Sequence, residues 1–408
     1  MTKDELALRD ARVFLHQSSS SPVLASLRHV EGVWIEQSDG RRLIDLHGNT
    51  AHLLGHGNPE IREALIAQLE EMPFCPRRYT NRPAVKLAEA LADRWPGGSA
   101  GVLLAPSGSD AIEIAMRLAR ACTGRFETIS IDGSYHGNGF GALGLSESAL
   151  DPRLGPHLPG RHHVAPYWRD GGAERMIEEI RRAFSNSATG ICAVIAEPMR
   201  SNCHVPPAWL WPEVRQLCDA HGALLIFDEI PSGLGRTGRF FAFEHFGVCP
   251  DIAVLGKSLG GGMLPLAAVI ADRKVDVAPE LDVGHYTHEK NPLLARAGLT
   301  TLNIVARDKL EQRAEQIGLR LREGLATIAR TRGIEVTPRG LGALLAVAFP
   351  GSPEEEDGGL VARCHAAGLS TTKKGRWSVG LSLPLTASDA EVDETLARFD
   401  AMASSLAG

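Results

Sequence analysis

The sequence lacks the features that would place the protein in a membrane, outside the cell or on a nucleic acid. No apolar run approaches the roughly 18–20 residues that a membrane-spanning helix requires. Residues 1–14, MTKDELALRDARVF, lack the apolar core of a signal peptide. The net charge of -6, without a long basic run, gives no general attraction to phosphate backbones. We therefore expect a cytoplasmic protein with no membrane and no nucleic acid partner.

Signals for disulfides and metal sites are also missing. The seven cysteines are an odd number without a CxxC pair, which indicates neither a disulfide framework nor a zinc site. They stand at positions 75, 122, 192, 203, 218, 249 and 364. The 15 histidines show no HExxH or comparable ligand spacing. We expect reduced cysteines that mostly pack in the interior, and no metal.

The composition is typical of a soluble globular protein, with 44% hydrophobic and 23% charged residues. A chain of 408 residues exceeds the usual size of one core, so we expect a large domain with a smaller one beside it. After about residue 300 the pattern changes to a long amphipathic helix, short strand-like pieces and a C-terminal helix. We assign 56–294 to the large domain, and 1–55 together with 295–408 to the small one.

Short apolar runs alternate with amphipathic segments through the middle of the chain. The apolar runs are 102–105, 191–197, 223–228, 252–256 and 266–271, and the amphipathic segments include 109–121 and 212–221. Fully apolar strands between amphipathic helices predict a mostly parallel sheet covered on both faces, and therefore an α/β fold. In such sheets, ligands gather at the carboxyl ends of the strands.

Two glycine-containing segments follow predicted strands. Gly108 and Ser109 open a helix, where unpaired backbone N–H groups could hold a phosphate. The same Ser-Gly-Ser-Asp sequence is also an ordinary helix cap. Tyr135 lies in SYHGNGFGA (134–142), where its ring could stack on a flat ligand or simply cover the core.

A pair of acids and a lysine end two further strands. Asp228 and Glu229 alternate along a strand, so only one of them can face a given ligand. Lys257 follows IAVLG (252–256) and precedes three glycines. A lysine in an apolar setting acquires a lowered pKa, which makes its amine nucleophilic, and surface lysines rarely have such neighbours. Lys257 is therefore a candidate for Schiff-base formation.

A phosphate cradle, an aromatic plate, an acid and a buried amine together describe a site for pyridoxal 5'-phosphate. This cofactor needs a lysine for its aldehyde and an acid that keeps its pyridine nitrogen protonated. Asp228 would be that acid.

At these residues the chain resembles the class III aminotransferases, which are pyridoxal-phosphate enzymes of fold type I, the aspartate-aminotransferase fold. The matching segments occur in the family's order: SGSDAIE, YHG, AEPM, LLIFDE, GLGRTGRFFAFEHFGVCPDI, LGKSLGGG and THEKNP. The resemblance implies that Lys257 forms the Schiff base and shuttles protons, and that Asp228 pairs with the pyridine nitrogen. It also implies that Tyr135 stacks on the ring.

The same resemblance implies a shared site. Gly108 and Ser109 would bind the phosphate, and Thr287 would reach it from a second subunit, so a homodimer with shared active sites is expected. The substrate would be a small-molecule amine. Glu197 lies near the cofactor in relatives, although a strand-terminal acid with no such role is an equal alternative.

The departures from the family pattern concern the substrate. Where members usually read DEVQ, this chain has Ile230 and Pro231 after the two acids, and proline cannot donate a hydrogen bond. Gly380 stands where many members carry an arginine that clamps the substrate's α-carboxylate. Only a guanidinium offers the matching fork. Arg376, four residues upstream, could substitute after a small shift.

Basic residues elsewhere suit a different anion. Arg77, Arg78 and Arg82 lie in FCPRRYTNRP (74–83) and could bind a phosphonate or phosphate ester, although each could equally belong to a solvated turn. We favour Arg78 because it adjoins Tyr79. RRYTN, THEKNP and DEIP resemble the (R)-1-hydroxy-2-aminoethylphosphonate ammonia-lyase branch of the family.

We therefore interpret the sequence as that of a lyase that releases ammonia from a hydroxylated aminophosphonate and gives phosphonoacetaldehyde. The main alternative is a transaminase that moves an amine to a keto acid such as pyruvate or 2-oxoglutarate, because it would share every cofactor residue. A third possibility is a non-catalytic binding module, against which the retained Lys257 argues.

Overall fold

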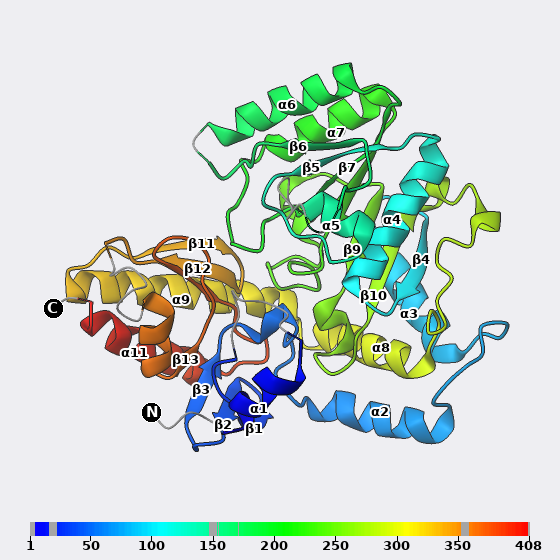
Figure 1. Ribbon diagram of the computed structural model, residues 1–408. Helices are drawn as coiled ribbons and strands as arrows, with labels where there is room; N and C mark the ends of the chain where they lie inside the picture. The colour runs from blue at the N-terminus through cyan, green and yellow to red at the C-terminus, as the bar shows by residue number, and fades with distance from the viewer. Residues whose placement is uncertain are drawn as a thin grey trace.

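The computed structural model describes residues 5–15, 23–146, 153, 155–169, 171–351 and 359–406. A seven-stranded sheet forms the centre of its larger part, with strand order β4-β10-β9-β8-β7-β5-β6 (Figure 1). The strands are β4 (Ala100–Ala105), β5 (Glu127–Ile131), β6 (Arg161–Val164), β7 (Ile191–Ala196), β8 (Leu224–Asp228), β9 (Ile252–Leu255) and β10 (Ala267–Asp272). β10 runs antiparallel to both β4 and β9, and the other neighbouring pairs are parallel.

Helices cover both faces of this sheet, which explains why its strands are almost entirely apolar. Leu225 and Phe227 of β8 pack in the core that contains α6 and α7, whereas Leu224 and Ile226 pack in the core that contains α4. The helices of this part are α2 (Pro59–Glu71), α3 (Arg82–Ala92), α4 (Gly108–Thr123), α5 (Phe140–Ser146), α6 (Gly172–Asn186) and α7 (Leu210–His221). The predicted α/β class with a mostly parallel sheet is confirmed.

Two smaller sheets join the two ends of the chain. In the four-stranded sheet, β13 (Leu369–Ser370) pairs in parallel with β3 (Arg42–Asp45), beside β2 (Trp34–Gln37) and β1 (Leu27–Glu31). The three-stranded antiparallel sheet consists of β11 (Thr337–Leu341), β12 (Leu344–Ala348) and β14 (Ser378–Leu381). In Figure 1 the four-stranded sheet lies below α9, at the lower left, whereas β11 and β12 of the three-stranded sheet lie directly above α9.

The remaining helices complete this smaller part and connect it to the large sheet. They are α1 (Glu5–Val13), α8 (Pro292–Arg307), α9 (Leu310–Arg332), α10 (Leu360–Ala366) and α11 (Asp389–Ser404), with 3-10 turns η1 (Gly48–Thr50), η3 (Ala242–Phe246), η4 (Lys257–Gly260), η5 (Arg273–Val275) and η6 (Pro279–Leu281). The boundary that the sequence suggests at 294/295 falls within α8, which packs on α2 and α3. The division into 56–294 and 1–55 plus 295–408 stays a prediction. None of the described helices is both long and apolar enough to span a bilayer.

A hydrogen-bonded junction links the N-terminal segment to the large sheet. The carbonyl oxygen of Thr50 accepts a hydrogen bond from Ser258 Oγ at 2.7 Å and another from Arg236 Nη2 at 3.3 Å. Arg236 is 1% exposed and also donates to Ser382 Oγ at 2.7 Å. One buried guanidinium therefore ties together the N-terminal segment, the loop after β8 and the segment after β14.

The packing of α9 on the β11–β12 turn generates a test of this arrangement. A Cβ at Gly318 would collide with the backbone carbonyl of Gly342, whereas a Cβ at Gly324 would meet only the side chain of Leu396. We expect Gly318→Ala to lower the free energy of unfolding by about 1–3 kcal/mol, because backbone cannot move aside cheaply. Gly324→Ala, in the same helix, should stay within about 1 kcal/mol of wild type. Thermal unfolding measures the stability of both variants. Equal unfolding midpoints would contradict the close contact between Gly318 and the Gly342 carbonyl.

Candidate active site

Four parallel strands end at one edge of the large sheet, and their loops carry the candidate site. Tyr135 and His136 follow β5, Glu197 follows β7, Asp228 ends β8, and Lys257 follows β9. Adjacent parallel strands place their carboxyl ends side by side. The structure thus brings together the acid, the aromatic ring and the lysine that the sequence singled out.

Lys257 begins the 3-10 turn η4 with φ 47°, in the left-handed region that non-glycine residues rarely adopt. Its neighbours on both sides are buried, but solvent reaches its own side chain. Loss of water around the ammonium, aided by Lys374 and Arg236, lowers the pKa of Lys257, although Asp228 and Glu197 oppose the shift. The lysine is therefore poised as a nucleophile beside open space, rather than packed in the core as its apolar sequence context suggests.

Asp228 is fixed by its neighbours. Its Oδ2 lies 2.8 Å from Nδ1 of His136, and its Oδ1 accepts a hydrogen bond from the Ile230 N–H at 3.1 Å. Asp228 and His136 are 2% and 1% exposed. The Nε2 atom of His136 is buried and has no hydrogen-bond partner among the described residues. The sequence reasoning did not assign a role to His136, although it stands in the quoted YHG segment.

Glu229 points to the other side of the strand, as the alternation predicts. Its carboxylate accepts hydrogen bonds from Ser232 Oγ at 2.6 Å and from the Phe243 N–H at 2.9 Å. Burial raises the pKa of Glu229 to about 7, against these hydrogen bonds. Glu229 thus holds the loop that follows β8, and Asp228 alone faces Lys257.

Glu197 forms a buried ion pair with Arg200, and its Oε2 accepts a hydrogen bond from the Ser201 N–H at 2.7 Å. Burial alone would raise the pKa of Glu197, but Arg200 and His136 outweigh it and the pKa lies below its usual value. Arg200 also donates to the Gly133 carbonyl. The pair links the loops after β5 and β7. Arg200 was not singled out from the sequence, although its partner Glu197 lies only three residues before it.

The N-terminus of α4 forms the candidate phosphate cradle. The first N–H groups of a helix have no partner within the helix and carry the positive end of its dipole. Ser107 caps the helix, and Ser109 Oγ accepts a hydrogen bond from the Asn138 N–H at 3.1 Å. A Cβ at Gly108 would lie 2.8 Å from Ile230 Cδ1, which places the cradle against the loop that follows Asp228.

These residues fit pyridoxal phosphate. The α4 N-terminus offers donors to a phosphate, Asp228 is a buried acid for a ring nitrogen, and Lys257 is an accessible amine. Tyr135 is 55% exposed, so its ring is available for stacking. Its backbone N–H lies 3.4 Å from Glu197 Oε1, which positions it beside the same cluster.

The other site residues suggested by the sequence lie apart from this cluster in the single chain. Arg77 is half-buried, and Arg78 and Arg82 are exposed; among the described residues none of the three hydrogen-bonds to the Lys257 cluster. Arg376 is exposed, with its guanidinium 4.4 Å from the centre of the Trp377 ring. Thr287 is exposed as well.

The segments 74–83 and 287–292, which the sequence linked to one another, do lie together. Asn81 Nδ2 donates to the Lys290 carbonyl at 2.8 Å, and the rings of Phe74 and His288 are 5.5 Å apart. Their proximity is consistent with a joint role, and the roles of Arg77, Arg78 and Thr287 stay predictions.

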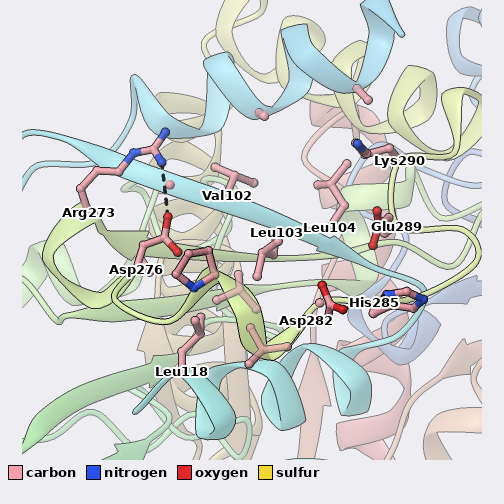
Figure 2. Close-up of a pocket in the computed structure, with 18 of the residues that line it drawn as sticks. Val102, Leu103, Leu104, Leu118, Arg273, Asp276, Asp282, His285, Glu289 and Lys290 are labelled. Carbon is pink, nitrogen blue, oxygen red and sulfur yellow. Dashed lines mark ion pairs between the residues drawn. The ribbon is translucent and has the colours of Figure 1, made fainter. Parts of the chain in front are cut away.

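Figure 2 shows a separate pocket of about 490 Å³ on the α3–β4–β10 side of the sheet. Leu103, Leu104 and Val102 of β4 line it together with His285, Glu289 and Lys290 of the long segment before α8. Lys257 and Asp228 do not line this pocket. It lies beside the segment that carries Thr287, and not at the strand ends where the candidate active site is built.

Comparison with known proteins identifies the family. The aminotransferase class-III family model matches residues 15–402. The chain belongs to the class III aminotransferases. The (R)-1-hydroxy-2-aminoethylphosphonate ammonia-lyase of Vibrio splendidus (strain 12B01) is 32% identical over 96% of this chain and 88% of its own length. The 4-aminobutyrate aminotransferase GabT of Escherichia coli (strain K12) is 33% identical over 92% of both chains.

Solved structures agree with this assignment. A Bacillus anthracis aminotransferase superposes with a TM-score of 0.87 at 27% identity and covers 98% of both chains. An amine transaminase from an uncultivated Pseudomonas species, solved in its PLP-bound form, gives a TM-score of 0.84 at 27% identity over 97% of this chain and 99% of its own. Fold type I is confirmed, and the cofactor of this enzyme family is pyridoxal 5'-phosphate.

The opposite orientations of the two acids generate a prediction. With Asp228→Asn we expect the rate of the amine-dependent reaction of the bound cofactor to fall on the order of 10²–10³-fold, because the amide cannot hold the ring nitrogen protonated. Glu229→Gln should retain most of the rate, because its side chain faces Ser232 and Phe243. The measurement is the amine-dependent change in the visible absorbance of the bound cofactor. A larger loss in Glu229→Gln than in Asp228→Asn would contradict the assignment.

Proposed function

We propose that the protein is a lyase that eliminates ammonia from a small hydroxylated aminophosphonate, (R)-1-hydroxy-2-aminoethylphosphonate giving phosphonoacetaldehyde. The observation that carries the proposal is Gly380 in β14, at the position where many family aminotransferases hold a keto-acid carboxylate with arginine. Without that guanidinium, the second half of a transamination loses its usual carboxylate clamp. The similarity to the Vibrio splendidus ammonia-lyase over 96% of this chain also supports a lyase activity.

The residues of the chain have distinct roles in this reaction. When bound, pyridoxal phosphate supplies the electron sink for a carbanion at the carbon that bears nitrogen. Lys257 Nζ takes the proton from that carbon, and its lowered pKa increases the share of neutral amine that can do so. Asp228 holds the proton of the ring nitrogen, and His136 orients its carboxylate through the 2.8 Å contact.

The atoms balance without a second organic substrate. The hydroxyl on the carbon next to the one bearing nitrogen leaves as water after accepting a proton. The enamine that results takes up one water and releases ammonia, so phosphonoacetaldehyde and ammonia account for every atom of the substrate. Lys257 can pass the proton that it takes from the carbon to the departing hydroxyl. The reaction therefore requires no oxidant and no keto acid.

A transaminase is the alternative, and one observation favours it. The 5-aminovalerate aminotransferase DavT of Pseudomonas aeruginosa is 34% identical over 92% of both chains, which is no less than the identity to the ammonia-lyase. A transaminase would use Lys257, Asp228 and the α4 N-terminus in the same ways. Only the groups that hold the substrate separate the two activities.

Single-substrate turnover tests the proposal. Purified holoenzyme with (R)-1-hydroxy-2-aminoethylphosphonate alone should release ammonia and aldehyde in equal amounts over many turnovers, because no amine acceptor is needed. Coupled assays for the two products measure this. A reaction that stops after one turnover per site, and resumes only when pyruvate or 2-oxoglutarate is added, would identify a transaminase instead.

We further propose that two copies of the chain form a homodimer with shared active sites. Exposed apolar side chains gather on α2 and the segment after it, namely Ile66, Leu69, Met72, Phe74 and Tyr79. Figure 1 shows α2 along the outer edge of the molecule. Such a patch on a folded protein is typical of a protein interface. Thr287 of one copy would then reach the phosphate in the other.

Sedimentation velocity tests the homodimer. We expect a single species of twice the 43.8 kDa chain mass at micromolar concentration. Replacing Ile66 and Leu69 with glutamate should shift it towards one chain, because buried unpaired charge opposes association. A wild-type species of one-chain mass that still turns over substrate would contradict the shared site.

A further inference from the structure

The side chain of Lys374 occupies the space above Gly380. Lys374 lies in the hairpin that leads into β14, and a Cβ built on Gly380 would stand 3.2 Å from Lys374 Cε and 3.5 Å from its Cγ. A residue with a side chain at 380 would therefore push the lysine stem aside. The glycine at 380 and the lysine at 374 are complementary, and Gly380 leaves room for a cation from the opposite arm of the same hairpin.

The backbone of Lys374 is held on both sides. Its N–H donates to the Ser378 carbonyl at 2.8 Å, and its own carbonyl accepts a hydrogen bond from Arg339 Nη2 at 2.7 Å. Arg339 Nη1 also donates to Ser378 Oγ at 3.0 Å. Gly380 N–H donates to the Thr372 carbonyl at 2.8 Å, which closes the hairpin. A backbone fixed in this way holds the base of the lysine side chain in place, so no loop has to become ordered when the ammonium binds an anion.

The ammonium belongs to the same cluster as Lys257. Loss of water lowers the pKa of Lys374, although Cys203 and Glu197 act in the opposite direction. In turn, the charge of Lys374 contributes to the lowered pKa of Lys257 and to that of His47. Hydrogen bonds also bring β14 towards this site: Ser382, two residues after Gly380, accepts one from Arg236, which donates to the same Thr50 carbonyl as Ser258. The small C-terminal sheet thus brings a cation towards the strand-end site of the large sheet.

The nearby carboxylates are already engaged. Glu197 pairs with Arg200, and Asp228 with His136. Across the described residues, no carboxylate lies within ion-pair distance of Lys374. A cation that has lost much of its water without gaining an anion is costly, and the cost is removed when a ligand brings the missing negative charge.

We propose that Lys374 binds the anionic group of the substrate and selects a phosphonate over a carboxylate. This inference rests on the proposed function for the identity of the anion. A guanidinium fork suits both anions, but it is the usual clamp for a carboxylate in this family. An ammonium is a compact point charge with three rotatable donors, and it attracts a phosphonate, which can carry a second negative charge, more strongly than a carboxylate. The structure thereby favours Lys374 over the exposed Arg78, Arg82 and Arg376 for this role.

The test uses ethylphosphonate, which carries the anion but has no amine to react with the cofactor. Calorimetry on the holoenzyme should show that Lys374→Met weakens ethylphosphonate binding by roughly 10- to 100-fold, because a charged hydrogen bond is lost. Methionine keeps the length of the stem over Gly380. The matched control is Lys373→Met, which removes the same charge from the adjacent, exposed position and should bind like wild type. Lys374→Arg should recover part of the affinity.

The outcomes separate this inference from the proposed function. Unchanged ethylphosphonate binding in Lys374→Met, or no binding by wild type, would overturn the role of Lys374 whatever reaction the enzyme performs. Lys374-dependent binding without single-substrate ammonia release would support the anion site and reject the lyase. A retained cofactor absorbance and unfolding midpoint in Lys374→Met shows that the variant is folded. In turnover, KM for the aminophosphonate should rise more than kcat falls.

Discussion

The site depends on a balance of charges gathered at the ends of four parallel strands. Asp228 and Glu197 are both almost fully buried. Asp228 is paired with His136, and Glu197 is paired with Arg200. These pairs satisfy the carboxylates before any ligand arrives. Beside these pairs stand two amines, Lys257 and Lys374, whose pKa values are both lowered. An unpaired cation in partly dry surroundings favours binding of an anion or conversion to the neutral amine, and the site can use both.

The fold could be predicted from the sequence largely because its signals are local. The apolar runs 191–197, 223–228 and 252–256 became β7, β8 and β9 within a residue or two. The run 266–271 became β10, but its antiparallel direction between β4 and β9 was not specified by any local pattern. The direction of β10 follows from how the chain turns back after Lys257 and the glycines that follow it. The composition of a fully apolar strand does not indicate whether the strand is parallel or antiparallel to its neighbours.

The residues of the candidate site likewise fall into those that local sequence signals predicted and those that they did not. Asp228 and Lys257 were found because an acid and a lysine directly after apolar strands are unusual within their own few residues. His136 and Lys374 were not, because their meaning comes from partners 92 positions away in one case and from a hairpin of another sheet in the other. The apolar setting of Lys257 suggested a packed amine, yet solvent reaches it. The residues next to Lys257 in the sequence predict the buried strand before it. The solvent exposure of its side chain depends instead on which loops surround it in the fold.

The presence of Gly380 and of a lysine from the same hairpin, in place of the family's arginine, bears on reaction type. A transaminase must hold two different acids in turn, so a rigid fork matched to the carboxylate they share serves both halves of its cycle. A lyase with one substrate has no second acid to accommodate, and its anion site need only suit one group. Gly380 removes the fork, and Lys374 places one compact charge over the same backbone. Because a side chain at 380 would push the lysine stem aside, the two arrangements compete for the same space, and a return to the carboxylate clamp would also displace Lys374.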